Sequence, residues 1–146
     1  MKRGNEIKGP VVIGGIGGSG TRVIAEILEL LNFHMGKDIS VVLDNFAYTL
    51  LFKRPGWFYR HRNNRQTLFR GLGIMEKAML RGGGLSLSEY LFLFNACISM
   101  SMRGHNRAKE GSGMWPLKRI KKLFEPLEED IKNYTGWGWK EPNSHL

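Results

Sequence analysis

Val11-Val12-Ile13-Gly14-Gly15-Ile16-Gly17-Gly18-Ser19-Gly20-Thr21-Arg22 is the stretch of sequence that decides the fold. A short β-branched run leads into a glycine-rich segment, and a periodic apolar helix follows, with Val23, Ile24, Ile27, Leu28 and Leu31 on one face. The pattern predicts a strand, a glycine loop and a helix N-terminus. Such a loop presents backbone N–H groups and the positive helix end to a phosphate or sulfate. Glycine suits it because a Cβ would block the close approach.

Three loop templates fit parts of this stretch. Gly15, Gly17 and Gly20 satisfy the dinucleotide pattern G-x-G-x-x-G, with residues 39–43 as the second strand and Asp44 on a ribose. A Walker loop would need Lys and then Ser or Thr after Gly20, where the chain has Thr21 and Arg22. The third template is a 5′-phosphosulfate loop closed by Ser-Gly-Thr, as in Gly18-Ser19-Gly20-Thr21. The glycines alone do not choose between the first and the third.

Length and composition set the protein class. A chain of 146 residues with 42% hydrophobic residues has room for one domain, 1–146, and is too apolar to be disordered. Its net charge of +9 favours an anionic substrate or partner, without choosing between nucleic acid, nucleotide and acidic glycan. The single cysteine, Cys97, excludes an intrachain disulfide and is expected to be a buried, inert thiol. With no signal peptide and no transmembrane segment in the pattern, we expect a soluble cytoplasmic protein.

Between the two ends the sequence predicts mainly helices. A turn is expected at 33–38, and after it either a strand over 39–43 or, preferably, a helix from near Asp44. Further helices are predicted over 68–80, over 86–102 after the capping box Ser86-Leu87-Ser88-Glu89, and from Pro116, with a restart at Pro126. Because the 86–102 helix is apolar nearly all round, it is expected to be the most buried one.

Residues 53–70 combine arginines with aromatic residues and contain no acidic residue. Basic and aromatic side chains together can contact phosphate or sulfate groups and stack on bases or sugars. They can equally form a solvated face whose aromatic rings pack inward. The sequence leaves both interpretations open.

The stretch Gly136-Trp137-Gly138-Trp139-Lys140-Glu141-Pro142-Asn143-Ser144-His145 is the second informative motif. Alternating tryptophans predict a short strand over 136–140, which Pro142 ends because it has no N–H to donate. Ligands of open parallel sheets bind beyond the carboxyl ends of strands. If this strand pairs parallel to 11–16, its polar end and the glycine loop lie at the same edge of the sheet.

A Ser-Gly-Thr glycine loop followed by a Trp-x-Trp-Lys-x-Pro-x-Ser-His strand end resembles the bacterial-type sulfotransferase family. The resemblance implies an α/β fold with a P-loop-like parallel sheet, and 3′-phosphoadenosine 5′-phosphosulfate as the sulfuryl donor. It implies transfer to a hydroxyl or amine, with a glycan, lipid or small molecule as acceptor, and it implies no metal. Nucleic acid is not the expected partner.

The resemblance also suggests a role for each site residue. Gly17, Gly18, Ser19, Gly20 and Thr21 would hold the donor's 5′-phosphate. Because many family members have Lys or Arg where this chain has Gly18, the missing cation would come from Arg22 or Lys140. Lys140 would neutralise the leaving group, and Glu141 or His145 would accept the proton of the acceptor.

The sheet expected from these two motifs has only two strands for about five helices. Family members continue past this strand to an Arg and a Ser that hold the donor's 3′-phosphate. We therefore expect an incomplete, helix-rich, N-terminal part of a sulfotransferase-like domain that transfers no sulfate alone. Two alternatives stay open: a fragment of an NAD-binding dehydrogenase that uses Gly15, Gly17, Gly20 and Asp44, and a non-catalytic basic module in which 53–70 binds nucleic acid.

Overall fold

The computed structural model describes residues 7–81, 84–103, 114–127 and 130–142. The chain divides into two compact units: unit 1 comprises Met1–Asn45 and Leu127–Leu146, and unit 2 comprises Phe46–Pro126. Unit 1 contains a parallel sheet and unit 2 is helical, so the predicted α/β class is confirmed. One unit is thus discontinuous in sequence and the other is contiguous.

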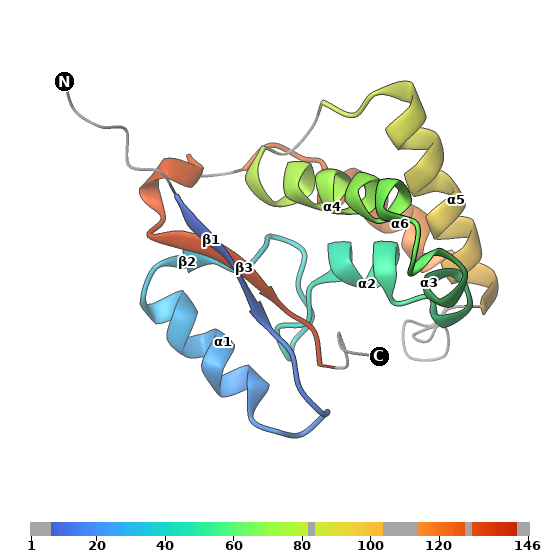
Figure 1. The fold of residues 1–146 in the computed structure, drawn as a ribbon. Coiled ribbons are helices and arrows are strands. Elements are labelled where there is room, and N and C mark those ends of the chain that lie inside the picture. Colours follow the sequence, from blue (N-terminus) through green and yellow to red (C-terminus); the bar gives the residue numbers. More distant parts are fainter. Residues whose placement is uncertain (1–6, 82–83, 104–113, 128–129, 143–146) are drawn as a thin grey trace. The chain divides into compact units, whose positions relative to one another are not determined.

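Unit 1 is built on a three-stranded sheet (Figure 1). β1 (Lys8–Ile13) and β2 (Phe33–His34) both pair in parallel with β3 (Gly136–Lys140), which lies between them. The predicted strand over 136–140 and its parallel pairing with the first strand are confirmed. The sheet has one strand more than the two that were expected, because residues 33–34 form β2 where a turn was predicted.

One helix of unit 1, α1 (Thr21–Leu30), packs along the sheet. Figure 1 shows it beside the three strands. Ala25 of α1 is buried with Ile13 and Met35, and Leu28 packs against this cluster. The apolar face predicted for α1 is only partly buried, since Val23, Ile24 and Ile27 are each about half exposed.

The segment before unit 2 is a turn closed by Ser40 and Asp44. Ser40 N–H donates to the Asp44 carbonyl at 2.9 Å, and Asp44 N–H donates to Ser40 Oγ at 3.0 Å. Asn45 N–H donates to the carbonyl of Lys140 at 3.0 Å, which fixes the turn beside the end of β3. The strand alternative for 39–43 is therefore wrong, and the preferred helix begins two residues after Asp44.

Within its described residues, unit 2 contains five helices: α2 (Phe46–Phe52), α3 (Pro55–His61), α4 (Arg65–Leu80), α5 (Leu87–Arg103) and α6 (Trp115–Leu123). Residues with less than 2% exposure form its core, among them Leu50, Leu51, Ile74, Met75, Leu93, Ala96, Cys97 and Met100. Six of the seven residues of α2 are buried, so α2 and not the 86–102 helix is the most buried one. The helix predicted after Pro126 is a 3-10 turn, η1 (Ile131–Asn133), in the part described.

The buried position predicted for Cys97 is confirmed, and burial raises the pKa of its thiol to about 12. Sγ lies 3.7 Å from the carbonyl oxygen of Pro116 at the start of α6. A thiol with so high a pKa carries almost no thiolate near neutral pH, and the thiolate is the reactive form. Among the helices described, none is long and apolar enough to cross a bilayer.

The capping box predicted at the start of α5 is confirmed. Ser86 N–H donates to Glu89 Oε2 at 2.8 Å, and Glu89 N–H donates to Ser86 Oγ at 3.3 Å. Lys77 of α4 donates to the Glu89 carboxylate at 2.8 Å. Hydrogen bonds from Lys77 and Ser86 lower the pKa of Glu89 to about 2.

This cap predicts an acid-dependent stability. Because the pKa of Glu89 is lowered on folding, its contribution is complete above its ordinary value near 4.5 and declines as pH falls toward 2. Near neutral pH, Glu89→Gln is expected to be less stable than the parent. Between about pH 4.5 and pH 2, it is expected to lose less stability than the parent loses. Denaturant unfolding followed by circular dichroism at several pH values measures both effects. Glu76→Gln, an exposed change on α4, is the control, and identical profiles for Glu89→Gln and the parent would contradict the prediction.

Candidate functional site

The glycine loop joins β1 to α1 at the carboxyl end of the parallel strands. Ser19 N–H donates to the Ile16 carbonyl at 3.0 Å and closes a turn. Gly20 is the N-cap residue of α1 and adopts a left-handed conformation with φ 77°, which disfavours residues that carry a Cβ. The predicted order of strand, glycine loop and helix N-terminus is present.

Open space lies in front of the loop. A Cβ added at Gly17, Gly18 or Gly20 would meet nothing within 4 Å. At Gly15, in contrast, it would lie 2.8 Å from Ser19 Oγ, because the loop folds over itself there. The first N–H groups of any helix have no intrahelical acceptors. An anion could therefore approach the loop at residues 17–20, directly before the N-terminus of α1.

The two hydroxyl residues of the loop that are predicted to hold the donor, Ser19 and Thr21, differ in their surroundings. Thr21 is only 6% exposed, whereas Ser19 is exposed. Arg22 points to the surface and pairs with Glu26 through an Nε–Oε1 distance of 3.2 Å. An exposed ion pair of this kind contributes about 0–1 kcal/mol, so Arg22 can leave Glu26 at little cost.

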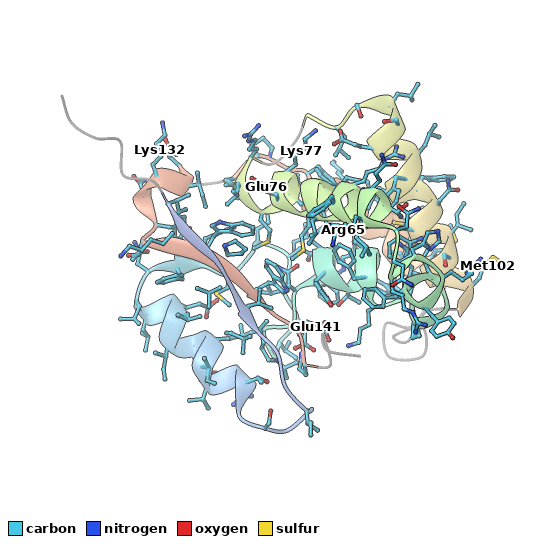
Figure 2. The ribbon with its side chains drawn as sticks, viewed as in Figure 1. Arg65, Glu76, Lys77, Met102, Lys132 and Glu141 are labelled. Carbon is cyan, nitrogen blue, oxygen red and sulfur yellow. The ribbon has the colours of Figure 1, made fainter. Side chains whose placement is uncertain are left out.

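The second motif lies at the same edge of the sheet as the loop. Lys140 is opposite Ile13, which is the last residue of β1 before the loop begins. Glu141 N–H donates to the Ile13 carbonyl at 3.1 Å and continues this pairing by one residue. Figure 2 shows Glu141 at the end of β3. The predicted juxtaposition of the two motifs is thus found in unit 1.

Lys140 is held by the turn that precedes unit 2. It is 2% exposed, and its Nζ donates to the Val42 carbonyl at 2.7 Å and to the Asp44 carboxylate. Its charge is compensated by Asp44. Glu141 has no exposed surface. His145, the other candidate base, lies outside the described residues.

The partnership of Asp44 with Lys140 was not predicted from sequence, where Asp44 was interpreted as a ribose ligand of a dinucleotide fold or as the start of a helix. The local signal was present: Ser40 and Asp44 are residue types that form side-chain-stabilised turns. That turn places Asp44 in a loop. Only the fold brings this loop next to Lys140 of β3, which is 96 residues away in sequence.

The basic segment 53–70 forms α3 and the beginning of α4. Arg54 is buried, donates from Nη2 to the Leu51 carbonyl at 2.7 Å, and lies 4.2 Å from the centre of the Trp57 ring. Burial lowers the pKa of Arg54 to about 10. Arg62 lies over the ring of Tyr59 at 4.1 Å. These two cations contact rings of their own unit, whereas no residue of α3 is buried and Tyr59 is 66% exposed.

Among the residues that the structure describes, no three His, Cys, Asp or Glu side chains are grouped as a metal site. Chemically, the edge of the sheet in unit 1 combines an open backbone loop at a helix N-terminus with a buried lysine and a buried glutamate. No protein-family model, no curated protein and no solved structure matches this chain.

Proposed function

We propose that the protein is a sulfotransferase whose glycine loop binds the 5′-phosphosulfate of 3′-phosphoadenosine 5′-phosphosulfate. The observation that carries the proposal is the register of β1 and β3, which puts Lys140 opposite the last residue before the loop. This arrangement supports a single ligand that reaches the loop and the end of β3. Sequence supports it independently through the Ser-Gly-Thr loop and the Trp-x-Trp-Lys-x-Pro strand end.

In this proposal the loop supplies the binding energy for the donor. The 5′-phosphate would bind in the open space beside Gly17, Gly18 and Gly20, where an added Cβ would meet nothing within 4 Å, and next to the N-terminus of α1. The N–H of Ser19 takes no part in this binding, because it donates to the Ile16 carbonyl. The exposed hydroxyl of Ser19 adds a donor, whereas buried Thr21 supports the start of the helix. Arg22 would exchange Glu26 for the anion.

Lys140 would act on the leaving group. As the acceptor oxygen forms its bond to sulfur, the bond from sulfur to the phosphate oxygen breaks and that oxygen takes the electron pair. For Lys140 to neutralise this oxygen, its Nζ would donate its third N–H to it or exchange Val42 or Asp44 for it. The acceptor's proton passes to a base, for which Glu141 is the described candidate.

The sharpest binding test is Gly17→Val. Gly17 is not in the left-handed region and has open space around it, so valine there obstructs the ligand without straining the backbone. Charge-assisted bonds contribute about 1.5–3 kcal/mol each, so we expect affinity for adenosine 3′,5′-bisphosphate to fall at least about tenfold. Isothermal titration calorimetry measures this, with Gly73→Val, at an unobstructed glycine of α4, as the control.

Unchanged affinity in Gly17→Val would remove the loop from the proposal. NAD titrated in parallel separates the dehydrogenase alternative, since a dinucleotide site would prefer NAD to the bisphosphate. Transfer itself is tested with a labelled donor and a panel of sugars, phenols and lipids. Turnover by the parent that Lys140→Met loses while it retains bisphosphate affinity is the result expected of a residue that acts on the leaving group. Such turnover would also contradict the expectation that this part of the domain transfers no sulfate alone.

A further inference from the structure

Helix α5 of unit 2 carries an exposed apolar stripe along its whole length. Its members recur every three or four residues and are 38–78% exposed: Leu87, Tyr90, Leu91, Phe94, Ile98 and Met102. The opposite face of α5 carries the buried residues Leu93, Ala96 and Met100. Leu87 and Met102 are fifteen helical steps of about 1.5 Å apart, so the stripe is about 22 Å long. Soluble monomers rarely expose so continuous an apolar surface unless something binds to it.

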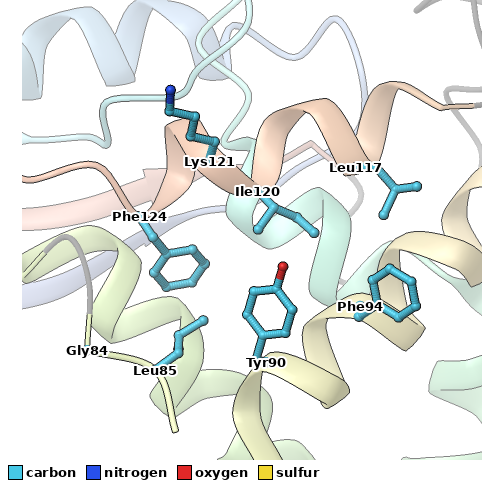
Figure 3. A pocket seen from close by; sticks show the side chains of 8 residues that line it. All are labelled: Gly84, Leu85, Tyr90, Phe94, Leu117, Ile120, Lys121 and Phe124. Atoms are coloured by element: carbon cyan, nitrogen blue, oxygen red, sulfur yellow. The ribbon is translucent and has the colours of Figure 1, made fainter. Parts of the chain in front are cut away.

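A pocket of about 510 Å³ adjoins this stripe between α5 and α6 (Figure 3). Tyr90 and Phe94 line it from α5, and Leu117, Ile120 and Phe124 line it from α6 and its C-terminal end. Figure 3 shows the ring of Tyr90 below Ile120, between the rings of Phe124 and Phe94. The stripe therefore continues into a depression wide enough for an acyl chain or a lipid glycerol region.

Lysines of α6 border this apolar surface. Lys118 and Lys121 are one helical turn apart, both are exposed, and Lys121 contributes to the pocket wall. In Figure 3 the ammonium of Lys121 points away from the rings of Tyr90 and Phe124. A lysine whose stem lies along apolar groups while its charge points outward is suited to a boundary between hydrocarbon and anionic head groups.

We propose that this surface of unit 2, the α5 stripe with the pocket and the two α6 lysines, docks on an anionic lipid bilayer. Aliphatic side chains of the stripe enter the acyl boundary, and Tyr90 lies at the level of the head groups, where amphipathic rings are enriched. Lys118 and Lys121 contact lipid phosphates or carboxylates. The charge of the lysines favours a bilayer over a neutral apolar partner. This docking is independent of the sulfotransferase proposal, because all its residues belong to unit 2.

Sedimentation of the full chain with unilamellar vesicles tests the proposal. Binding is expected with phosphatidylcholine containing about 30 mol% phosphatidylserine, and it should weaken between about 0.1 M and 0.5 M salt. Lys118→Gln with Lys121→Gln should reduce partitioning roughly fivefold for each lysine removed. Leu91→Ser with Met102→Ser should reduce it by a similar factor at every salt concentration; Figure 2 shows Met102 projecting from α5.

The matched control is Arg62→Gln with Arg65→Gln, which removes the same charge from exposed residues of the same unit. This control should change partitioning less than twofold. Equal losses in the two charge variants, equal binding to vesicles of pure phosphatidylcholine, or no binding at all would overturn the proposal. A parent dimer that Leu91→Ser converts to a monomer would also overturn it, since the stripe would then cover a second copy. Circular dichroism and the unfolding midpoint establish that each variant is folded.

Discussion

Gly138→Ala is expected to destroy the sheet of unit 1, with a loss of more than about 4 kcal/mol in the free energy of unfolding. A Cβ at this position would overlap the carbonyl oxygen of Val11 and would lie 3.0 Å from its carbonyl carbon. Both atoms belong to the backbone of β1, so this overlap cannot be relieved by rotating a side chain. The strands would have to separate, and Ile13 and Lys140 would lose their register.

Gly73→Ala is the matched control for this change. Gly73 lies in the interior of α4, where an added Cβ meets nothing within 4 Å. Alanine there is expected to stabilise the protein by about 0.5–1 kcal/mol, because glycine is a poor helix former. Urea unfolding followed by fluorescence measures both variants. A Gly138→Ala protein as stable as the parent would show that β1 and β3 are not so closely paired.

The second large effect is expected at the pair formed by Lys140 and Asp44. Asp44→Asn leaves an ammonium that is 2% exposed without its counter-charge, which should cost about 3 kcal/mol of stability. Lys140→Met replaces the side chain by an apolar one of similar length. The double variant should therefore be more stable than Asp44→Asn alone, because no buried charge is left uncompensated.

A double-mutant cycle measured by chemical unfolding isolates the coupling between these two side chains. The control is Glu26→Gln, which breaks the exposed pair with Arg22 and should cost less than about 1 kcal/mol. A small loss in Asp44→Asn, comparable with that in Glu26→Gln, would contradict the assignment of a buried pair. The 25% exposure of the Asp44 side chain is the reason to expect about 3 kcal/mol rather than more.

Features with strong local chemistry were predictable from sequence. The glycine loop, the capping box Ser86–Glu89 and the strand over 136–140 follow from residue types whose backbone preferences leave few alternatives. Of the candidate site, the juxtaposition of the loop with Lys140 was predicted correctly, because parallel pairing brings the ends of two strands together.

Features that depend on tertiary context were not predictable in this way. β2 has only two residues, too few for any periodic pattern, and it forms because these residues pair with β3. The apolar residues of α5 were expected to be buried on all sides, yet hydrophobic content does not say how many partners a helix has. The ion pair of Asp44 with Lys140 also depends on tertiary context, because the loop that carries Asp44 lies beside Lys140 only in the folded unit.

The position of β3 at the centre of the sheet also determines the order in which the protein can form during synthesis. Unit 2 is contiguous in sequence, and its helices can fold as soon as they leave the ribosome. β1 and β2 emerge first but share no hydrogen-bonded edge with each other, because β3 separates them. At about 5–20 residues per second, the roughly 100 residues between β2 and β3 take on the order of 5–20 s to make. During that interval β1 and β2 lack the β3 strand with which they pair, and an unpaired strand edge can pair with another chain.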